Sequence, residues 1–210
     1  MPLRLIHSEP ATPTHETITF KVTLRHVAPE VWRRIEVPSE YTFWDLHVAI
    51  QDAMGWHDTH LHQFRVEDRR TGVSARIGIP DPDPLEGRIA DQPGWLVTLD
   101  AWLARSDVSV KYTYDFGDWW EHDVALESRG TRDPTISYPR CLAGERACPP
   151  EDCGGPPLYA EMLTAHENPG TEHARGVPGW ADRDFDPAAF DVAEVTFDDP
   201  AVRLRRVWGK

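Results

Sequence analysis

The sequence predicts an α+β protein with a single domain, in which a mixed or mainly antiparallel sheet packs against a few helices. Three observations support this. Apolar residues alternate with polar ones over 18–24 and again over 120–127, as in half-buried strands. Apolar residues over 43–54 instead recur at helical spacing. Because strands and helices are mixed in this order along the chain, an α+β architecture is expected.

The first 55 residues predict a hairpin followed by a helix. The strand over 18–24 is followed by a less regular alternation over 31–37, with a turn near Pro29 between them. Thr42 is an expected helix N-cap with Asp45 three residues later, and Gly55 is the expected stop.

The other expected elements are a strand over 60–68, a short helix over 99–105, a hairpin of strands 108–115 and 120–127, a helix over 156–168, and a segment over 199–208 that the pattern leaves open between strand and short helix.

Composition sets the domain organisation and excludes some partners. Residues 1–15 are expected to be a flexible N-terminal segment, and residues 16–210 one domain with an acidic C-terminal part. Residues 151–200 hold twelve acidic residues and two arginines, which fits either a solvated face or a surface for cations or partners. The net charge of -13 argues against a broad nucleic-acid interface. An N-terminus without an apolar core and the lack of a long apolar run predict a cytoplasmic protein that does not enter a membrane.

Three histidines form the first candidate site. On a strand, His60 and His62 would project to one face, and His122 from another strand could complete a three-ligand site for a divalent metal such as zinc. The alternative is that each histidine is packed in the core and hydrogen-bonded to backbone or carboxylate groups.

The cysteine-rich stretch CLAGERACPPEDCGG forms the second candidate. The spacing of its three cysteines does not match a zinc finger, and an odd number in an expected reducing compartment argues against a disulfide framework. Prolines and glycines instead predict a rigid loop that presents Glu151 and Asp152, with Cys148 as a further ligand-binding candidate. Such a loop could hold a cation or a substrate, or it could simply cap the sheet.

The loop in YTYDFGDWWEHDVALE is the third candidate. Its letters DFG match the magnesium-binding element of protein kinases, but the chain has none of the accompanying kinase motifs. Asp115, Asp118, Trp119 and His122 are candidate ligand-binding residues. Alternatively, the stretch is a hairpin loop in which Asp115 or Asp118 accepts backbone N–H groups while Phe116 and Trp119 close the end of the sheet.

Taken together, LHVAIQDAMGWHDTHLHQF, the hairpin quoted above and CLAGERACPPEDCGGPPLYAEML resemble the plasmid pRiA4b Orf-3-like family, and DFDPAAFD is similar to the family's tail motif. The resemblance covers about residues 20–195. It implies a compact α+β domain found in bacteria, often near plasmid or transposon genes, and no settled activity. Some relatives are labelled as transposon-passenger resolvases, but this acidic chain lacks the arginine-rich serine site and the basic DNA-binding end that such an enzyme needs.

These patterns predict a binding protein whose site lies where the DFGD loop, the HLH segment and the CPPEDCGG loop converge, with a small molecule or a protein as its partner. The first alternative is a metal-dependent hydrolase in which His60, His62 and His122 hold a divalent ion and Glu151 or Asp152 is the general base. The second alternative is a DNA-associated accessory factor of a mobile element.

Overall fold

The structure, a computed structural model, describes residues 16–80, 92–104, 107–172 and 185–208. Its elements are β1 (Glu16–Leu24), β2 (Trp32–Pro38), α1 (Phe43–Met54), β3 (His62–Asp68), β4 (Val73–Gly78), β5 (Gln92–Pro93), the short helix η2 (Gly94–Leu96), α2 (Leu99–Leu103), β6 (Val108–Tyr114), β7 (Trp120–Thr131), β8 (Arg140–Glu145), α3 (Gly155–Glu167), the short helix η3 (Val192–Glu194) and α5 (Pro200–Trp208).

All eight strands join one mixed sheet with the order β5-β4-β3-β6-β7-β1-β2-β8. Every neighbouring pair is antiparallel except β4 and β5, which run parallel. The predicted α+β class with a mixed, mainly antiparallel sheet is therefore confirmed. None of the described helices has the length and apolarity that crossing a bilayer would require.

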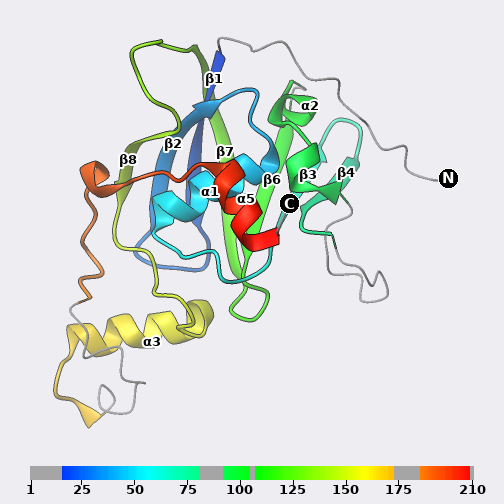
Figure 1. Cartoon of the computed structure of the whole chain (residues 1–210). Coiled ribbons are helices and arrows are strands. Elements are labelled where there is room, and N and C mark those ends of the chain that lie inside the picture. Colours follow the sequence, from blue (N-terminus) through cyan, green and yellow to red (C-terminus); the bar gives the residue numbers. More distant parts are fainter. Residues whose placement is uncertain (1–15, 81–91, 105–106, 173–184, 209–210) are drawn as a thin grey trace.

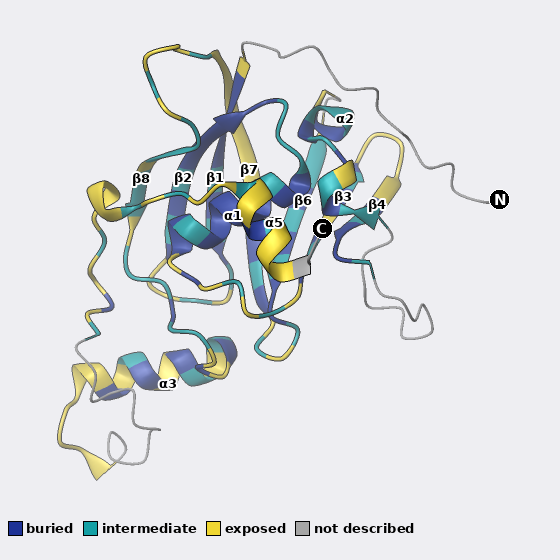
Figure 2. Cartoon of the chain, in the orientation of Figure 1, coloured by how far each residue is buried: buried dark blue, intermediate teal, exposed yellow. Residues whose placement is uncertain are grey.

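Helix α1 lies across one face of the sheet, and α5 lies on the outer side of α1 (Figure 1). The capping predicted for α1 is present: the Thr42 hydroxyl accepts a hydrogen bond from the Asp45 N–H, and the Asp45 carboxylate accepts one from the Thr42 N–H. Gly55 ends the helix in the left-handed conformation. Figure 2 shows α1 largely buried and α5 largely exposed, so the core lies between α1 and the sheet.

The opposite face of the sheet carries charged side chains that pair across strands. Arg34 on β2 donates to Glu127 on β7, and Lys111 on β6 pairs with Asp123 on β7. These ion pairs are solvent-exposed and contribute little to stability.

Arg33 is a charged residue on the buried face. Its guanidinium donates to the carbonyl oxygens of Trp32, Ala53 and Glu145 and stacks on the Phe190 ring, with 3.9 Å from Cζ to the ring centroid. Burial lowers its pKa. Arg33 thereby ties strands β2 and β8 and the end of α1 to the segment that precedes η3.

The C-terminal segment that the sequence left open between strand and helix is the helix α5. Arg203 on α5 pairs with Asp52 on α1 at 2.6 Å and with Asp198 at 2.7 Å. The Trp44 indole on α1 donates to the Pro200 carbonyl. These bonds explain why α5 packs on α1 rather than joining the sheet.

Three details differ from the sequence-based expectations. The cysteine-rich stretch begins as strand β8, which contains Cys141, and only its second part is a loop. Strand β3 begins at His62, so His60 lies outside it. Strand β4 was not predicted. The expected flexible segment 1–15, most of the turn-rich region around residues 78–94, and residues 173–184 lie outside the described part of the chain.

Candidate functional site

Three segments that are distant in sequence meet at one end of the sheet. The His60 Nε2 atom lies 2.8 Å from Asp152 Oδ1 in the cysteine loop and 3.7 Å from Asp115 Oδ2 in the DFGD loop. Asp115 is buried, His60 is half-buried and Asp152 is exposed. We call His60, Asp115 and Asp152 the sheet-end group. Their ligand atoms all lie within 4.8 Å of one another, and the two carboxylates make the site a candidate for a cation.

The DFGD loop is held by its own backbone. Asp115 is in the left-handed conformation and accepts a hydrogen bond from the Gly117 N–H at 2.8 Å. The Trp119 N–H donates to the Asp115 carbonyl at 2.6 Å. Asp118 turns to the cysteine loop and accepts the Gly154 N–H at 2.8 Å. Both aspartates thus accept backbone N–H groups, whereas the sequence interpretation expected this of Asp115 or Asp118.

Gly155, the first residue of α3, sits directly against the DFGD loop. Its φ is 76°, and an added Cβ would lie 2.5 Å from the Asp118 carbonyl oxygen. The position therefore requires glycine for both its conformation and the space available. This close approach sets the distance between the two loops that bring Asp115 and Asp152 together.

Glu151 is fixed beside the sheet-end group. Its carboxylate accepts hydrogen bonds from the His57 N–H at 2.8 Å and from the Tyr114 hydroxyl at 2.9 Å. The Tyr114 oxygen in turn accepts the Thr59 N–H. Burial, together with the nearby Glu151 charge, raises the pKa of Tyr114 well above its usual value, so its hydroxyl stays protonated and donates.

A pocket of about 620 Å³ opens beside these carboxylates. Glu151 and Asp152 supply its charge, and apolar side chains form much of its wall (Met54, Trp56, Pro149, Pro150 and Phe185). A second pocket of about 370 Å³ is lined by Asp52, Asp58, Asp198 and Arg203, among others. The short stretch Gly55, Trp56 and His57 lines both pockets and so forms a shared wall between them.

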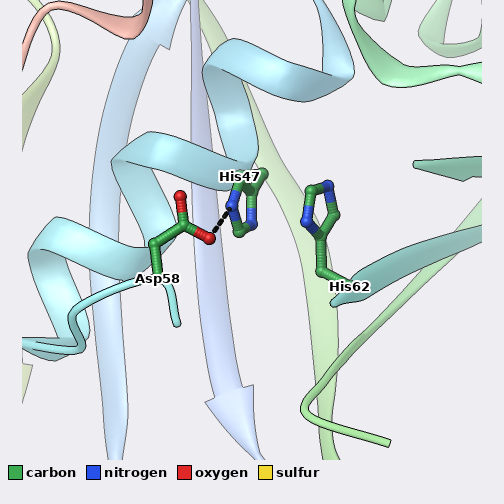
Figure 3. A group of neighbouring side chains, drawn as sticks. All are labelled: His47, Asp58 and His62. Atoms are coloured by element: carbon green, nitrogen blue, oxygen red, sulfur yellow. Dashed lines mark hydrogen bonds and ion pairs between the residues drawn. The ribbon is translucent and has the colours of Figure 1, made fainter. Parts of the chain in front are cut away.

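A second group of metal-ligand side chains lies under α1. It consists of His47 on α1, Asp58 in the turn that follows and His62 at the start of β3, and we call it the buried histidine group (Figure 3). The His47 Nε2 atom is 2.9 Å from Asp58 Oδ1. The rings of His47 and His62 stack with centroids 3.4 Å apart and planes inclined by 9°.

His62 is 1% exposed, and neither of its ring nitrogens has a hydrogen-bond partner among the described residues. Burial lowers the pKa of His62 well below its usual value, and His47 adds to this effect, so the ring is neutral. Both ring nitrogens of His47, in contrast, have hydrogen-bond partners, because its Nδ1 atom lies 2.8 Å from the Tyr112 hydroxyl. That hydroxyl also accepts from the Gln51 side chain at 2.9 Å.

The three histidines expected to share a metal lie apart from one another. Among the described residues, the side chains that could hold a metal fall into two groups. His60 belongs to the sheet-end group, His62 belongs to the buried histidine group, and His122 belongs to neither. The physical reason is register. His62 is aligned with Tyr114 on β6 and Trp120 on β7, whereas His122 is aligned with Tyr112.

His122 is a core histidine. Its ring lies edge-on to Trp56 and 5.2 Å from Tyr112, measured between ring centroids, and its Nε2 atom is buried without a hydrogen-bond partner among the described residues. Burial lowers its pKa to about 4. At neutral pH His122 is therefore an uncharged ring packed in the core.

The remaining candidates lie around the sheet end. Trp119 is 46% exposed and packs on Phe116. Cys148 lines the larger pocket together with Cys153. Burial raises the pKa of Cys148 well above its usual value and that of Cys153 to about 12, so both thiols stay protonated at neutral pH. All three cysteines are free.

Sequence reasoning missed His47 and Asp58. A signal was present: His47 and Gln51 follow Phe43 at intervals of four, so both polar residues fall on the buried face of α1. Polar residues in that position need partners, which here are Tyr112 and Asp58.

Comparison with known proteins shows that the chain is similar to proteins described as uncharacterized or of unknown function. Residues 16–194 match the model of a family described as plasmid pRiA4b ORF-3-like protein. The chain is 36% identical over 196 residues to the uncharacterized protein y4hQ of Sinorhizobium fredii, covering 90% of this chain and 94% of that one. It is also similar to the crystal structure of a protein of unknown function, MM3350 from Methanosarcina mazei Go1. The TM-score is 0.75 at 37% identity, with 87% of this chain and 98% of that chain covered.

Proposed function

The chain belongs to the plasmid pRiA4b ORF-3-like family, and from its own residues we propose that it is a ligand-binding domain whose pocket at the sheet end takes a small organic cation. The ligand would be an amine or a guanidine with an apolar body, or the basic side chain of a partner protein. The family's relatives reported above supply no activity that could be transferred.

One observation carries this proposal: Glu151 and Asp152 of the cysteine loop line one pocket, and the Asp115 carboxylate of the DFGD loop lies within 4.8 Å of that of Asp152. Asp115, Glu151 and Asp152 come from the DFGD loop and the cysteine loop, and none of the described residues that line the larger pocket is a lysine or an arginine. His60 is the basic side chain that faces two of these acids. A negatively charged rim beside an apolar wall favours a ligand that is cationic at one end and apolar at the other.

Calorimetric titration with matched ligands tests the proposal. A panel of alkyl and aryl amines is compared with alcohols of the same size, because the two series differ mainly in charge. Amines should bind, alcohols should bind at least about tenfold more weakly, and Asp152→Asn should weaken amine binding by about tenfold. Asp107→Asn is the matched control, because Asp107 is an exposed acid just before the opposite end of β6 and pairs with Arg69. Equal binding of amines and alcohols, or no binding of either, would contradict the proposal.

A second candidate function is a hydrolase that depends on a divalent ion. The observation that favours it is the 4.8 Å clustering of ligand atoms in the sheet-end group, with Glu151 held beside it by Tyr114 and His57. Glu151 would then be the general base for an ion-bound water. Turnover of chromogenic esters or phosphates should appear with Mn²⁺ or Zn²⁺ and be lost in Glu151→Gln. Activity that is unchanged in that variant would exclude this role.

A further inference from the structure

We propose that the buried histidine group, His47, Asp58 and His62, is a site for a first-row divalent transition metal ion of the zinc class. The site is distinct from the pocket at the sheet end and does not depend on the function proposed for that pocket. Two imidazoles and one carboxylate are a donor set that zinc accepts, with a fourth position left for water or another ligand. One donor atom from each residue lies within 4.8 Å of the others.

The unpaired atoms of the group point to a ligand. Both ring nitrogens of His62 and the Asp58 Oδ2 atom are buried and have no hydrogen-bond partner in the part of the chain that the structure describes. Buried polar atoms are seldom left unpaired, because removing them from water costs free energy that no contact returns. A metal ion among these three residues would give a partner to one of the unpaired His62 nitrogens.

A hydrogen-bonded chain fixes the orientation of His47. The Asp58 carboxylate can only accept, so His47 Nε2 carries the proton in their 2.9 Å contact, and Nδ1 accepts from the Tyr112 hydroxyl. Gln51 donates to the same hydroxyl oxygen. Such an outer contact on the second nitrogen is typical of histidine ligands to metals. On metal binding, His47 would change to its other neutral tautomer: Nε2 loses its proton to solvent, Nδ1 takes up one proton from solvent, and no net proton is released by the ring. The ion would then lie between Nε2 and Asp58, and Nδ1 would donate to the Tyr112 oxygen after the hydroxyl hydrogen has turned away.

Binding requires a small rearrangement, which the contacts allow. With bonds of about 2.0–2.1 Å in a tetrahedron, two ligand atoms stand about 3.3 Å apart. His47 Nε2 and Asp58 Oδ1 therefore need to separate by only a few tenths of an ångström from their 2.9 Å contact. The His62 ring must turn out of its parallel stack with His47, since parallel rings direct their nitrogen lone pairs side by side rather than at one point. No hydrogen bond to a described residue holds the His62 ring in the stack.

A route for the ion is present. Asp58 lines the second pocket, of about 370 Å³, whose other acids are Asp52 and Asp198. Arg203 pairs with both of these acids, so Asp58 is the carboxylate of this pocket that is directed to the histidines. An ion that enters this pocket, which Arg206 also lines, would reach the two imidazoles through Asp58.

The experiment measures Zn²⁺ and Co²⁺ binding by full-length protein made without a metal-binding tag. Protein that has been stripped of metal with a chelator should bind one equivalent of Zn²⁺ or Co²⁺ at the buried histidine group. Co²⁺ should give the intense visible absorption of a tetrahedral site, and Zn²⁺ should raise the melting temperature by several degrees. His62→Phe keeps an aromatic ring for the stack and should weaken Co²⁺ binding at least about 100-fold. Asp58→Asn, which retains an oxygen acceptor for His47, should weaken it by about tenfold or more.

His122→Phe is the matched control, because His122 is also a buried histidine with an unpaired nitrogen, yet it belongs to neither group of metal-ligand side chains. It should leave the Co²⁺ spectrum and affinity unchanged. The proposal is overturned if stripped, folded protein gives no tetrahedral Co²⁺ spectrum, or if His62→Phe binds Co²⁺ as tightly as the native protein does. A spectrum lost equally in His62→Phe and His122→Phe would also overturn it, because binding would then depend on general core packing.

Discussion

His60 and His62 are two residues apart in the chain but lie in opposite surroundings. His60 is half-buried, and its Nε2 atom faces the carboxylates of Asp115 and Asp152. The ring of His62 is buried against the ring of His47, and neither of its nitrogens has a hydrogen-bond partner among the described residues. The polar side chains of the sheet-end group pair with one another, whereas the buried histidine group keeps unpaired polar atoms. The difference shows that closely spaced histidines acquire their chemistry from the elements packed around them.

The largest expected effect is a pH dependence of stability that comes from the buried core. Burial lowers the pKa of His122 to about 4, from an unfolded value of about 6.5. Below pH 6.5 the unfolded chain takes up a proton that the folded chain resists, so the free energy of unfolding falls as the pH falls and levels off below about pH 4. Over this window His122 should contribute on the order of 3 kcal/mol. Urea unfolding from pH 7 to pH 4 measures it.

His122→Phe isolates this contribution. The difference between the native and variant pH profiles should rise from zero near pH 7 to its full size near pH 4, apart from a constant offset. A difference that does not change with pH would show that His122 titrates normally in the folded protein.

The sheet end should depend on the close approach of its two loops. Gly155→Ala puts a Cβ at 2.5 Å from the Asp118 carbonyl oxygen and forces alanine into a left-handed conformation. We expect it to lower the free energy of unfolding by about 2–3 kcal/mol. Gly72→Ala is the control: its φ is also positive but nothing lies within 4 Å of the added Cβ, so only about 1 kcal/mol should be lost. Equal losses in a thermal or urea melt would mean that the loop contact is not tight.

Two tyrosines on β6 allow the two regions to be compared by mutation. The Tyr112 hydroxyl hydrogen-bonds to His47 of the buried histidine group and to Gln51, and the Tyr114 hydroxyl hydrogen-bonds to Glu151 at the sheet end. Tyr112→Phe leaves two buried polar groups unpaired and should cost about 2 kcal/mol. Tyr114→Phe frees groups that water can reach and should cost about 1 kcal/mol or less. Urea unfolding measures both losses. A larger loss in the free energy of unfolding for Tyr114→Phe than for Tyr112→Phe would contradict this prediction.

The smallest effect on stability is expected at the exposed acid of the sheet-end group. Asp152 pairs with His60 near solvent, so Asp152→Asn should change the free energy of unfolding by no more than about 0.5 kcal/mol. The same variant is expected to weaken amine binding, as described above. A large loss of stability in the melt would show that Asp152 supports the loop and is not available to a ligand.

The sequence revealed the locally determined parts of the fold. The caps of α1 at Thr42 and Gly55 and the period-two hairpin of β1 and β2 depend on neighbouring residues, and the structure contains both. Strand β8 pairs with β2, which is more than a hundred residues away in the chain. Apolar and polar residues do not alternate regularly in β8, so the sequence pattern does not predict this strand. The packing of α5 on α1 depends on Arg203 and Trp44, a long-range contact that no local pattern encodes.

The candidate site shows the same division. The turn residues of the DFGD and cysteine loops pointed to a common region, and the structure brings one acid from each loop to His60. The pairing of His47 with His62 was missed because it depends on how α1 crosses the sheet. His122 was grouped with His60 and His62 because pattern alone does not show that β6 lies between β3 and β7 or how these strands are aligned.

The wall formed by Gly55, Trp56 and His57 has a thermodynamic consequence. His57 donates its N–H to Glu151 on one side, and this stretch joins α1 to Asp58 on the other. A ligand that displaces the wall from one pocket changes the shape of the other. Because linkage is reciprocal, an ion at Asp58 and a ligand at Glu151 would alter each other's affinity by the same factor. Three residues at the end of α1 would then couple the two pockets of this domain.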